Sequence, residues 1–237
     1  MRARLEMQGL GLDVFYEEDG AVERILRSRG IRGVIMAPLI RLPYRHLNWD
    51  WNKFSVVIAG SGLWRPEFNR VRFNHFEEMS LILHHLRHLK FKKVGLITDE
   101  RVDNRSQRAI TGGFYAYADN LAGRNKAVFV ANPGDGPAVI RWLIRYQPDA
   151  VIAGSAQAVR GVQGSGIETQ LVFISKDFHP DARQYPGIHQ DYGLLGNTSA
   201  EQLFSLLALN QSGIPNDPMK LFVTGRWEPG GVKKVVL

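Results

Sequence analysis

The chain of 237 residues contains no cysteine, which excludes disulfide bonds and thiolate chemistry. It also lacks an apolar run long enough to span a membrane. Residues 1–8 are charged and have no apolar segment of the kind found in signal peptides. We therefore expect a cytoplasmic protein with no membrane partner, and a reducing compartment is compatible with its composition.

Common signatures of catalysis and cofactor binding are absent as well. The sequence has no Walker loop and no Gly-x-Ser-x-Gly elbow, and Gly9-x-Gly11 lacks the third glycine of a dinucleotide-binding turn. His84 and His88 have the i, i+4 spacing that can hold zinc, but no carboxylate lies one turn away, which favours a solvated basic helix face. We therefore predict no enzyme, no catalytic residue, no metal site and no cofactor.

Length and charge set broad limits. A chain of this length forms one large domain or two lobes, and its 44% hydrophobic residues are enough for a core. Lysine and arginine exceed aspartate and glutamate by 30 − 23 = 7. This excess favours a polyanionic neighbour, and the alternative is that the basic residues are spread over a solvated surface.

Short β-rich runs alternate with amphipathic stretches along the chain, which is typical of parallel βαβ units. The expected fold class is α/β, with parallel sheets flanked by helices. Ligands of such sheets bind outside the carboxyl ends of the strands, where several of the runs end in small or polar residues. The predicted strands are residues 10–15, 33–37, 54–59, 94–98, 128–131, 150–153 and 171–175, and the predicted helices are residues 20–29, 76–89, 109–121 and 137–146.

Three groups of side chains at these positions are candidate ligand contacts. Arg101, Arg105 and Arg108 follow a predicted strand, where a guanidinium can bind hydroxyl or carboxylate groups of a small molecule; surface ion pairs with acidic neighbours are an equal alternative. Asp177 ends an apolar strand and could accept two sugar hydroxyls, or could cap a turn. Trp64 follows a Gly-rich loop and could stack on a sugar ring, although packing is the more ordinary role.

The most strongly patterned segment begins at residue 189. Gln190, Asp191 and Tyr192 precede a predicted helix, so they lie beside free backbone N–H donors and are expected to face a ligand. The apolar stripe of this helix is predicted to contain Ala200, Leu203, Phe204 and Leu207.

Residues 188–200 resemble the segment of LacI/GalR-family transcriptional regulators that enters the effector cleft and then forms a helix on the dimer side. They read Ile-His-Gln-Asp-Tyr-Gly-Leu-Leu-Gly-Asn-Thr-Ser-Ala. Other pieces resemble the same family in the same order and cover almost the whole chain: residues 21–35, 84–97, 173–177 and the closing strand at 222–232.

This resemblance implies a two-lobed, periplasmic-binding-protein-like domain that closes on a small effector, often a sugar or a nucleobase, and forms a homodimer. It implies that Asp177, Gln190 and Tyr192 contact the effector. The arginine that the family uses falls on Ile110 here, which leaves Arg105 or Arg108 to take its place.

The resemblance also implies a division into lobes and a missing start. The N-terminal lobe would contain residues 1–74 and about 190–220, and the C-terminal lobe residues 75–189 and about 221–237. Family members begin with a DNA-binding headpiece, followed by a first strand and helix, whereas this chain opens inside what resembles the end of that helix. We therefore expect a truncated sequence that reaches operator DNA only through the missing headpiece. The alternative function is a periplasmic-type solute-binding protein for sugar transport.

Overall fold

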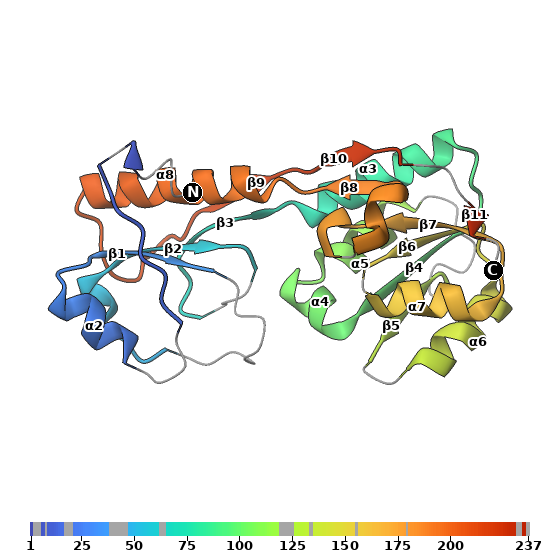
Figure 1. The fold of residues 1–237 in the computed structure, drawn as a ribbon, viewed down its shortest axis with the longest axis horizontal. Coiled ribbons are helices and arrows are strands. Elements are labelled where there is room, and N and C mark those ends of the chain that lie inside the picture. The colour runs from blue at the N-terminus through green and yellow to red at the C-terminus, as the bar shows by residue number, and fades with distance from the viewer. Residues whose placement is uncertain are drawn as a thin grey trace. The chain divides into compact units, whose positions relative to one another are not determined.

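The computed structural model describes residues 1, 6–7, 9–16, 21–37, 47–61, 65–118, 126–132, 135–154, 156–178, 180–230 and 234–235. The chain divides into two compact units, of which unit 1 comprises Met1–Phe73 and Asp191–Val223, and unit 2 comprises Asn74–Gln190 and Thr224–Leu237. Each unit has a largely parallel sheet with helices packed on it (Figure 1). The expected α/β fold class is therefore confirmed. None of the helices in the described part is long and apolar enough to cross a membrane.

Unit 1 is built on a parallel sheet with the strand order β1-β2-β3-β9. Because strand side chains alternate between faces, Val57 and Ala59 pack beneath helix α8, whereas Val56 and Ile58 pack with helix α2 and the aromatic turn η1. The elements are α2 (Val22–Ser28), β1 (Gly33–Met36), η1 (Trp51–Lys53), β2 (Ser55–Ala59), β3 (Asn69–Phe73), α8 (Tyr192–Ala208) and β9 (Lys220–Val223).

Unit 2 has a sheet with the strand order β10-β8-β7-β6-β4-β5, in which β10 is antiparallel to β8 and β11 pairs with β7. Its elements are α3 (His75–His88), β4 (Val94–Asp99), α4 (Glu100–Arg105), α5 (Ala109–Tyr117), β5 (Val128–Ala131), α6 (Gly136–Tyr146), β6 (Ala150–Ala153), α7 (Ala156–Ser165), β7 (Thr169–Phe173), η3 (Lys176–Phe178), η4 (Pro180–Gln184), β8 (Gly187–His189), β10 (Arg226–Glu228) and β11 (Lys234–Val235).

Both faces of the unit 2 sheet are buried. Leu96 and Ile152 belong to a core with helices α3 and α5, whereas their neighbours Ile97 and Val151 belong to a second core with α6 and α7. Strands covered on both sides read as continuous apolar runs, which is why the sequence pattern located β4 and β6 closely.

Three expectations from the sequence need correction. Residues 10–15 form neither helix nor strand, because no neighbouring strand pairs with them in the described part of the chain. Phe204 is 38% exposed, since α8 buries the face that carries Leu203 and Leu206. The strand predicted at residues 171–175 is β7, which begins and ends two residues earlier. Strand β3 and helix α7 are not among the elements that the sequence pattern predicts.

Candidate functional site

The carboxyl ends of the central strands of unit 2 bring three sequence segments to one edge. Strands β4, β6 and β7 are adjacent and parallel, so Thr98, Gly154 and Ser175 lie where these strands end. The Thr98 side chain is fully buried and Ser175 is 9% exposed, yet neither hydroxyl has a hydrogen-bond partner among the residues that the structure describes. Buried polar groups are nearly always paired, so two unpaired hydroxyls at one sheet edge need an explanation.

Gly154 makes room for the Thr98 hydroxyl. A Cβ atom at Gly154 would lie 2.8 Å from Thr98 Oγ1 and 3.1 Å from Ile174 Cδ1. A side chain at position 154 would therefore displace the threonine. The glycine at this strand end lets the Thr98 hydroxyl occupy the space.

Lys176 and Asp177 follow β7 and have different surroundings. Lys176 is buried, and its Nζ lies 3.1 Å from Glu228 Oε2 on β10. The hydrogen bond from Lys176 lowers the pKa of Glu228. Asp177 is exposed, and its carboxylate makes no hydrogen bond or ion pair with any residue that the structure describes. The lysine is therefore engaged within unit 2, whereas the aspartate is available to a ligand.

Of the three candidate arginines, Arg101 is exposed in α4, and Arg105 and Arg108 lie around the junction of α4 and α5. Arg105 ends α4 and is half-buried, and Arg108 is exposed with a left-handed φ of 58°. Neither forms an ion pair within the described residues. Asp99 instead caps α4 by accepting a hydrogen bond from the Val102 N–H at 2.8 Å. Ile110, where the family resemblance would place an arginine, is 1% exposed in the core.

Two of the remaining predicted contacts, Gln190 and Tyr192, belong to different units. Gln190 is 2% exposed in unit 2, and its Nε2 donates to Glu78 Oε2 at 2.8 Å. Tyr192 begins α8 in unit 1, is 56% exposed, and packs its ring edge-on against Phe73 at 5.0 Å. Trp64 lies outside the described residues. The structure therefore gathers the strand-end residues of unit 2 but shows no contact among the predicted site residues it describes.

The histidines of α3 form an aromatic cluster. The His84 and His88 rings are 4.4 Å apart, and His85 stacks on Trp227 at 4.6 Å with an interplanar angle of 8°. Burial lowers the pKa of His85, and the neighbouring His84 and His88 add to this effect. No group of three or more His, Asp or Glu side chains that could hold a metal ion occurs among the described residues.

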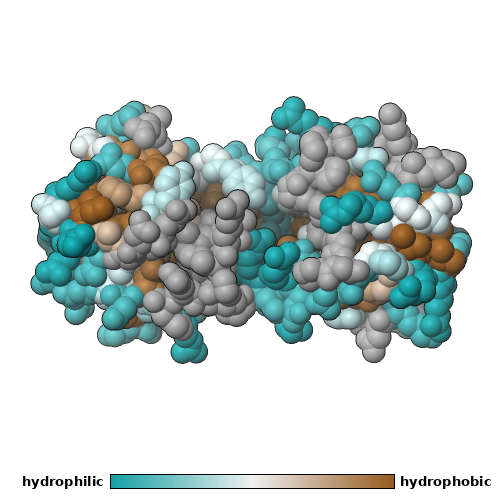
Figure 2. All heavy atoms as spheres, turned by 60° about the horizontal axis from the view of Figure 1, so that its bottom comes forward, coloured by the Kyte–Doolittle hydropathy of each residue, from teal (hydrophilic) through white to brown (hydrophobic). Residues whose placement is uncertain are grey.

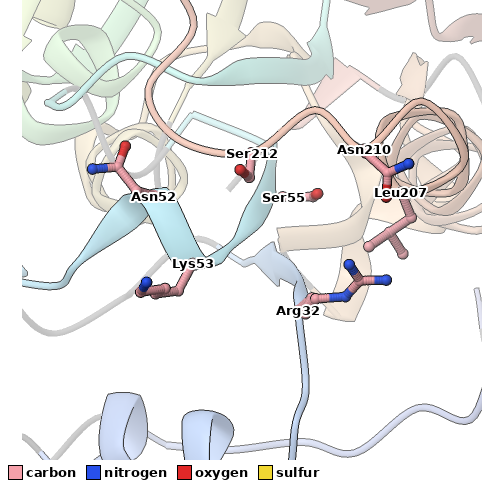
Figure 3. A pocket seen from close by; sticks show the side chains of 7 residues that line it. All are labelled: Arg32, Asn52, Lys53, Ser55, Leu207, Asn210 and Ser212. Carbon is pink, nitrogen blue, oxygen red and sulfur yellow. The ribbon is translucent and has the colours of Figure 1, made fainter.

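Unit 1 has a pocket at the end of its sheet where strands β1 and β2 begin. Its volume is about 210 Å³, below the range of roughly 300–1,000 Å³ typical of small-molecule sites. Figure 3 shows that the lining side chains come from segments beside β1 and β2 and from the end of α8. Arg32 precedes β1 and Ser55 begins β2, so the pocket lies at the amino ends of these strands. Its place and size do not match an effector site of an α/β sheet.

The coloured surface in Figure 2 is mainly hydrophilic, and its apolar residues form small separate patches. Patches of this kind are ordinary on a protein surface. Among the described residues on that face, the distribution of apolar side chains therefore gives no indication of a partner-binding surface.

Comparisons with solved structures identify the fold. A transcription regulator from Lactobacillus plantarum matches with a TM-score of 0.71 at 13% identity, over 99% of this chain and 92% of the regulator. A LacI family transcriptional regulator from Enterococcus faecium with bound ribose matches at 0.66 and 15%, over 98% and 92% of the two chains. The transcriptional regulator CelR in complex with cellobiose matches at 0.68 and 14%, over 96% and 75%.

No family model matches the sequence, and no curated protein matches it either. At these low identities the structural likeness establishes the fold, which is that of LacI-type regulators. The two-lobed, periplasmic-binding-protein-like fold expected from the resemblance is confirmed.

Proposed function

We propose that the chain is the effector-sensing domain of a LacI-type transcriptional regulator, and that it binds a small sugar-like molecule without catalysing a reaction. One observation carries the proposal: the buried hydroxyls of Thr98 and Ser175, which have no partner in the described part of the chain, lie at the carboxyl edge of the unit 2 sheet, in a fold shared with sugar-bound regulators. The same edge carries the exposed carboxylate of Asp177.

Each of these groups suits a sugar. The Asp177 carboxylate can accept hydrogen bonds from two neighbouring hydroxyls of a ring. The hydroxyls of Thr98 and Ser175 can each donate one hydrogen bond and accept another. Either Arg105 or Arg108 supplies a guanidinium from the side of α4 and α5, and Tyr192 and Trp64 would contribute from unit 1. The Gln190 side chain already donates a hydrogen bond to Glu78.

The finer parts of the function are also proposals. The effector would bind between the two units and favour one of their arrangements, since a ligand shifts a two-state equilibrium only by binding one state better. In a homodimer this change would alter the spacing of N-terminal headpieces, which would contact operator DNA in the cytoplasm.

Thermal unfolding in the presence of ligands tests the proposal. The panel includes ribose, cellobiose, other mono- and disaccharides, and nucleobases. A ligand that binds only the native state stabilises it by about 2.7 kcal/mol at 100 times its Kd, so a true effector raises Tm in a concentration-dependent way.

Three variants then locate the site. We expect Asp177→Asn and Thr98→Val to reduce the ligand-induced rise in Tm by more than half. Thr169→Val is the matched control, because the Thr169 hydroxyl is also buried and has no partner among the described residues, but it lies at the amino end of β7. It should retain the full rise. A panel without any concentration-dependent rise, or a rise that all three variants retain, would contradict the proposal.

A further inference from the structure

The chain passes between the two units at three places: after Phe73, after Gln190 and after Val223. Residues of unit 2 that flank these crossings are bound by two adjacent glutamates, Glu77 and Glu78, in the first turn of α3. We call these seven residues the crossover clasp: Asn74, His75, Glu77, Glu78, Gln190, Thr224 and Gly225. All of them belong to unit 2.

Glu78 contacts all three crossings. Its side chain is fully buried, and its Oε2 accepts a hydrogen bond from Gln190 Nε2 at 2.8 Å and lies 3.0 Å from His75 Nδ1. Its Oε1 accepts from the backbone N–H of Gly225 at 3.1 Å. His75, Gln190 and Gly225 stand beside the first, second and third crossing. One carboxylate therefore joins segments up to 147 residues apart in the sequence.

Glu77 adds an exposed layer to the same arrangement. Its Oε2 accepts from Asn74 Nδ2 at 2.8 Å and from Thr224 Oγ1 at 3.1 Å. Its backbone N–H donates to Asn74 Oδ1 at 3.3 Å, which caps the helix. The residues beside the first and third crossings are thus joined by two carboxylates, the buried one of Glu78 and the exposed one of Glu77.

The third crossing can approach Glu78 only because residue 225 is glycine. A Cβ atom at Gly225 would lie 2.3 Å from Ile188 Cγ2, 2.8 Å from the His189 carbonyl oxygen and 2.9 Å from Glu78 Oε1. The packing around the clasp is therefore tight on the side of β8 as well. A buried carboxylate is tolerated when hydrogen-bond donors surround it, and the clasp supplies them.

We infer that Glu78 is a positioning residue that sets the arrangement of the two units and limits how far one can turn relative to the other. Such a turn is absorbed by backbone rotation at the few residues where the chain crosses. Because the clasp holds the unit 2 side of all three crossings together, rotation is confined to the bonds immediately beyond it. This inference goes beyond ligand sensing, and its test uses no ligand, so its failure is distinct from failure of the proposed function.

Distance measurement between two spin labels tests the role of the clasp. The chain has no cysteine, so Ala116→Cys on α5 and Ala208→Cys on α8, both exposed, give one label in each unit without background labelling. Double electron–electron resonance then reports the distribution of inter-unit distances. We expect Glu78→Gln to broaden this distribution at least twofold or to shift its mean, because the amide offers one acceptor oxygen where the carboxylate offers two.

A reciprocal exchange separates the specific contact from general damage. Gln190→Glu alone places two carboxylates against each other and should also broaden the distribution. In the double variant Glu78→Gln and Gln190→Glu, the amide of residue 78 donates to the new carboxylate and still accepts from the Gly225 N–H. We expect this variant to return the distribution to its original width and mean.

The control is Glu100→Gln, the same change at an exposed glutamate in the first turn of α4. It should leave the distances unchanged. If Glu78→Gln does not fold, as judged by its circular dichroism, Thr224→Val removes an exposed bond of the clasp and should still broaden the distribution. Unchanged distances in a folded Glu78→Gln, or in Thr224→Val when it is needed, overturn the inference, as does a double variant that stays as broad as the single ones.

Discussion

Replacing Thr98 by valine should stabilise the ligand-free protein. Thr98 lies in β4 with no exposed surface, and its hydroxyl has no hydrogen-bond partner within the described ranges. A buried polar group without a hydrogen bond costs about 1–3 kcal/mol, and valine replaces the hydroxyl by a methyl group of similar size. Valine also suits a strand better. Taking the lower end, a gain of about 1 kcal/mol corresponds to a rise in Tm of about 2–4 °C for a chain of this size.

Thr111→Val is the matched comparison, because it makes the same change at another buried threonine of unit 2. The Thr111 hydroxyl lies 3.0 and 3.1 Å from the two carboxylate oxygens of Asp103, which is itself 3% exposed. Its removal should cost about 1–3 kcal/mol, since a charge-assisted hydrogen bond is lost and the carboxylate stays buried. The two substitutions should therefore move Tm in opposite directions.

Thermal and urea unfolding followed by circular dichroism measure both effects. The urea midpoint should rise for Thr98→Val and fall for Thr111→Val, with unchanged slopes. A Thr98→Val protein that unfolds at a lower temperature than the parent would refute the reasoning, because it would mean that the hydroxyl is satisfied in the native state. The Thr98 hydroxyl would then not be free to form a hydrogen bond with a ligand.

Two further predictions concern packing and pH. Gly112→Ala should stabilise the protein by about 0.5–1 kcal/mol, because a Cβ at this helical position meets nothing within 4 Å. Gly113→Ala should destabilise it by about 1–3 kcal/mol, because the new Cβ would lie 3.0 Å from Met79 Cβ. Urea unfolding should therefore show changes of opposite sign for the two variants. Glu228→Gln should destabilise at neutral pH, where the carboxylate pairs with Lys176. The pKa of Glu228 is lowered in the fold, so this contribution is present above its ordinary pKa of 4.5 and is lost as the pH falls through the folded value. Parent and variant should therefore converge in stability as the pH falls through the lowered pKa of Glu228, and a difference that stays constant over the acidic range would contradict the assignment.

The sequence located the elements whose two faces are both covered. Strands such as β4 and β6 read as apolar runs, and the polar residues at or just after the ends of runs of this kind include Thr98, Ser175 and Asp177. Strand β3 could not be recognised in the same way, because Arg70 and Arg72 alternate with apolar residues and resemble an exposed segment. Both arginines are buried, and burial together with Arg72 lowers the pKa of Arg70 to about 10.

Residues 10–15 are the converse case, a strand that the sequence pattern predicts and the structure does not form. Its alternating apolar residues have a strand-like pattern, but Val14 is 64% exposed and the described chain provides no strand beside it. A strand is stabilised by the ladder of hydrogen bonds to a neighbour, which a local pattern cannot supply.

The sequence by itself determined the α/β class, the absence of thiol chemistry and the presence of polar residues at several strand ends, because these depend on composition and on local periodicity. Only the tertiary structure decided that Gln190 binds Glu78, 112 residues away, and that Gly225 completes the same buried carboxylate. Contacts between segments so distant in the chain follow from how the sheets and crossings are assembled, and no local pattern encodes them.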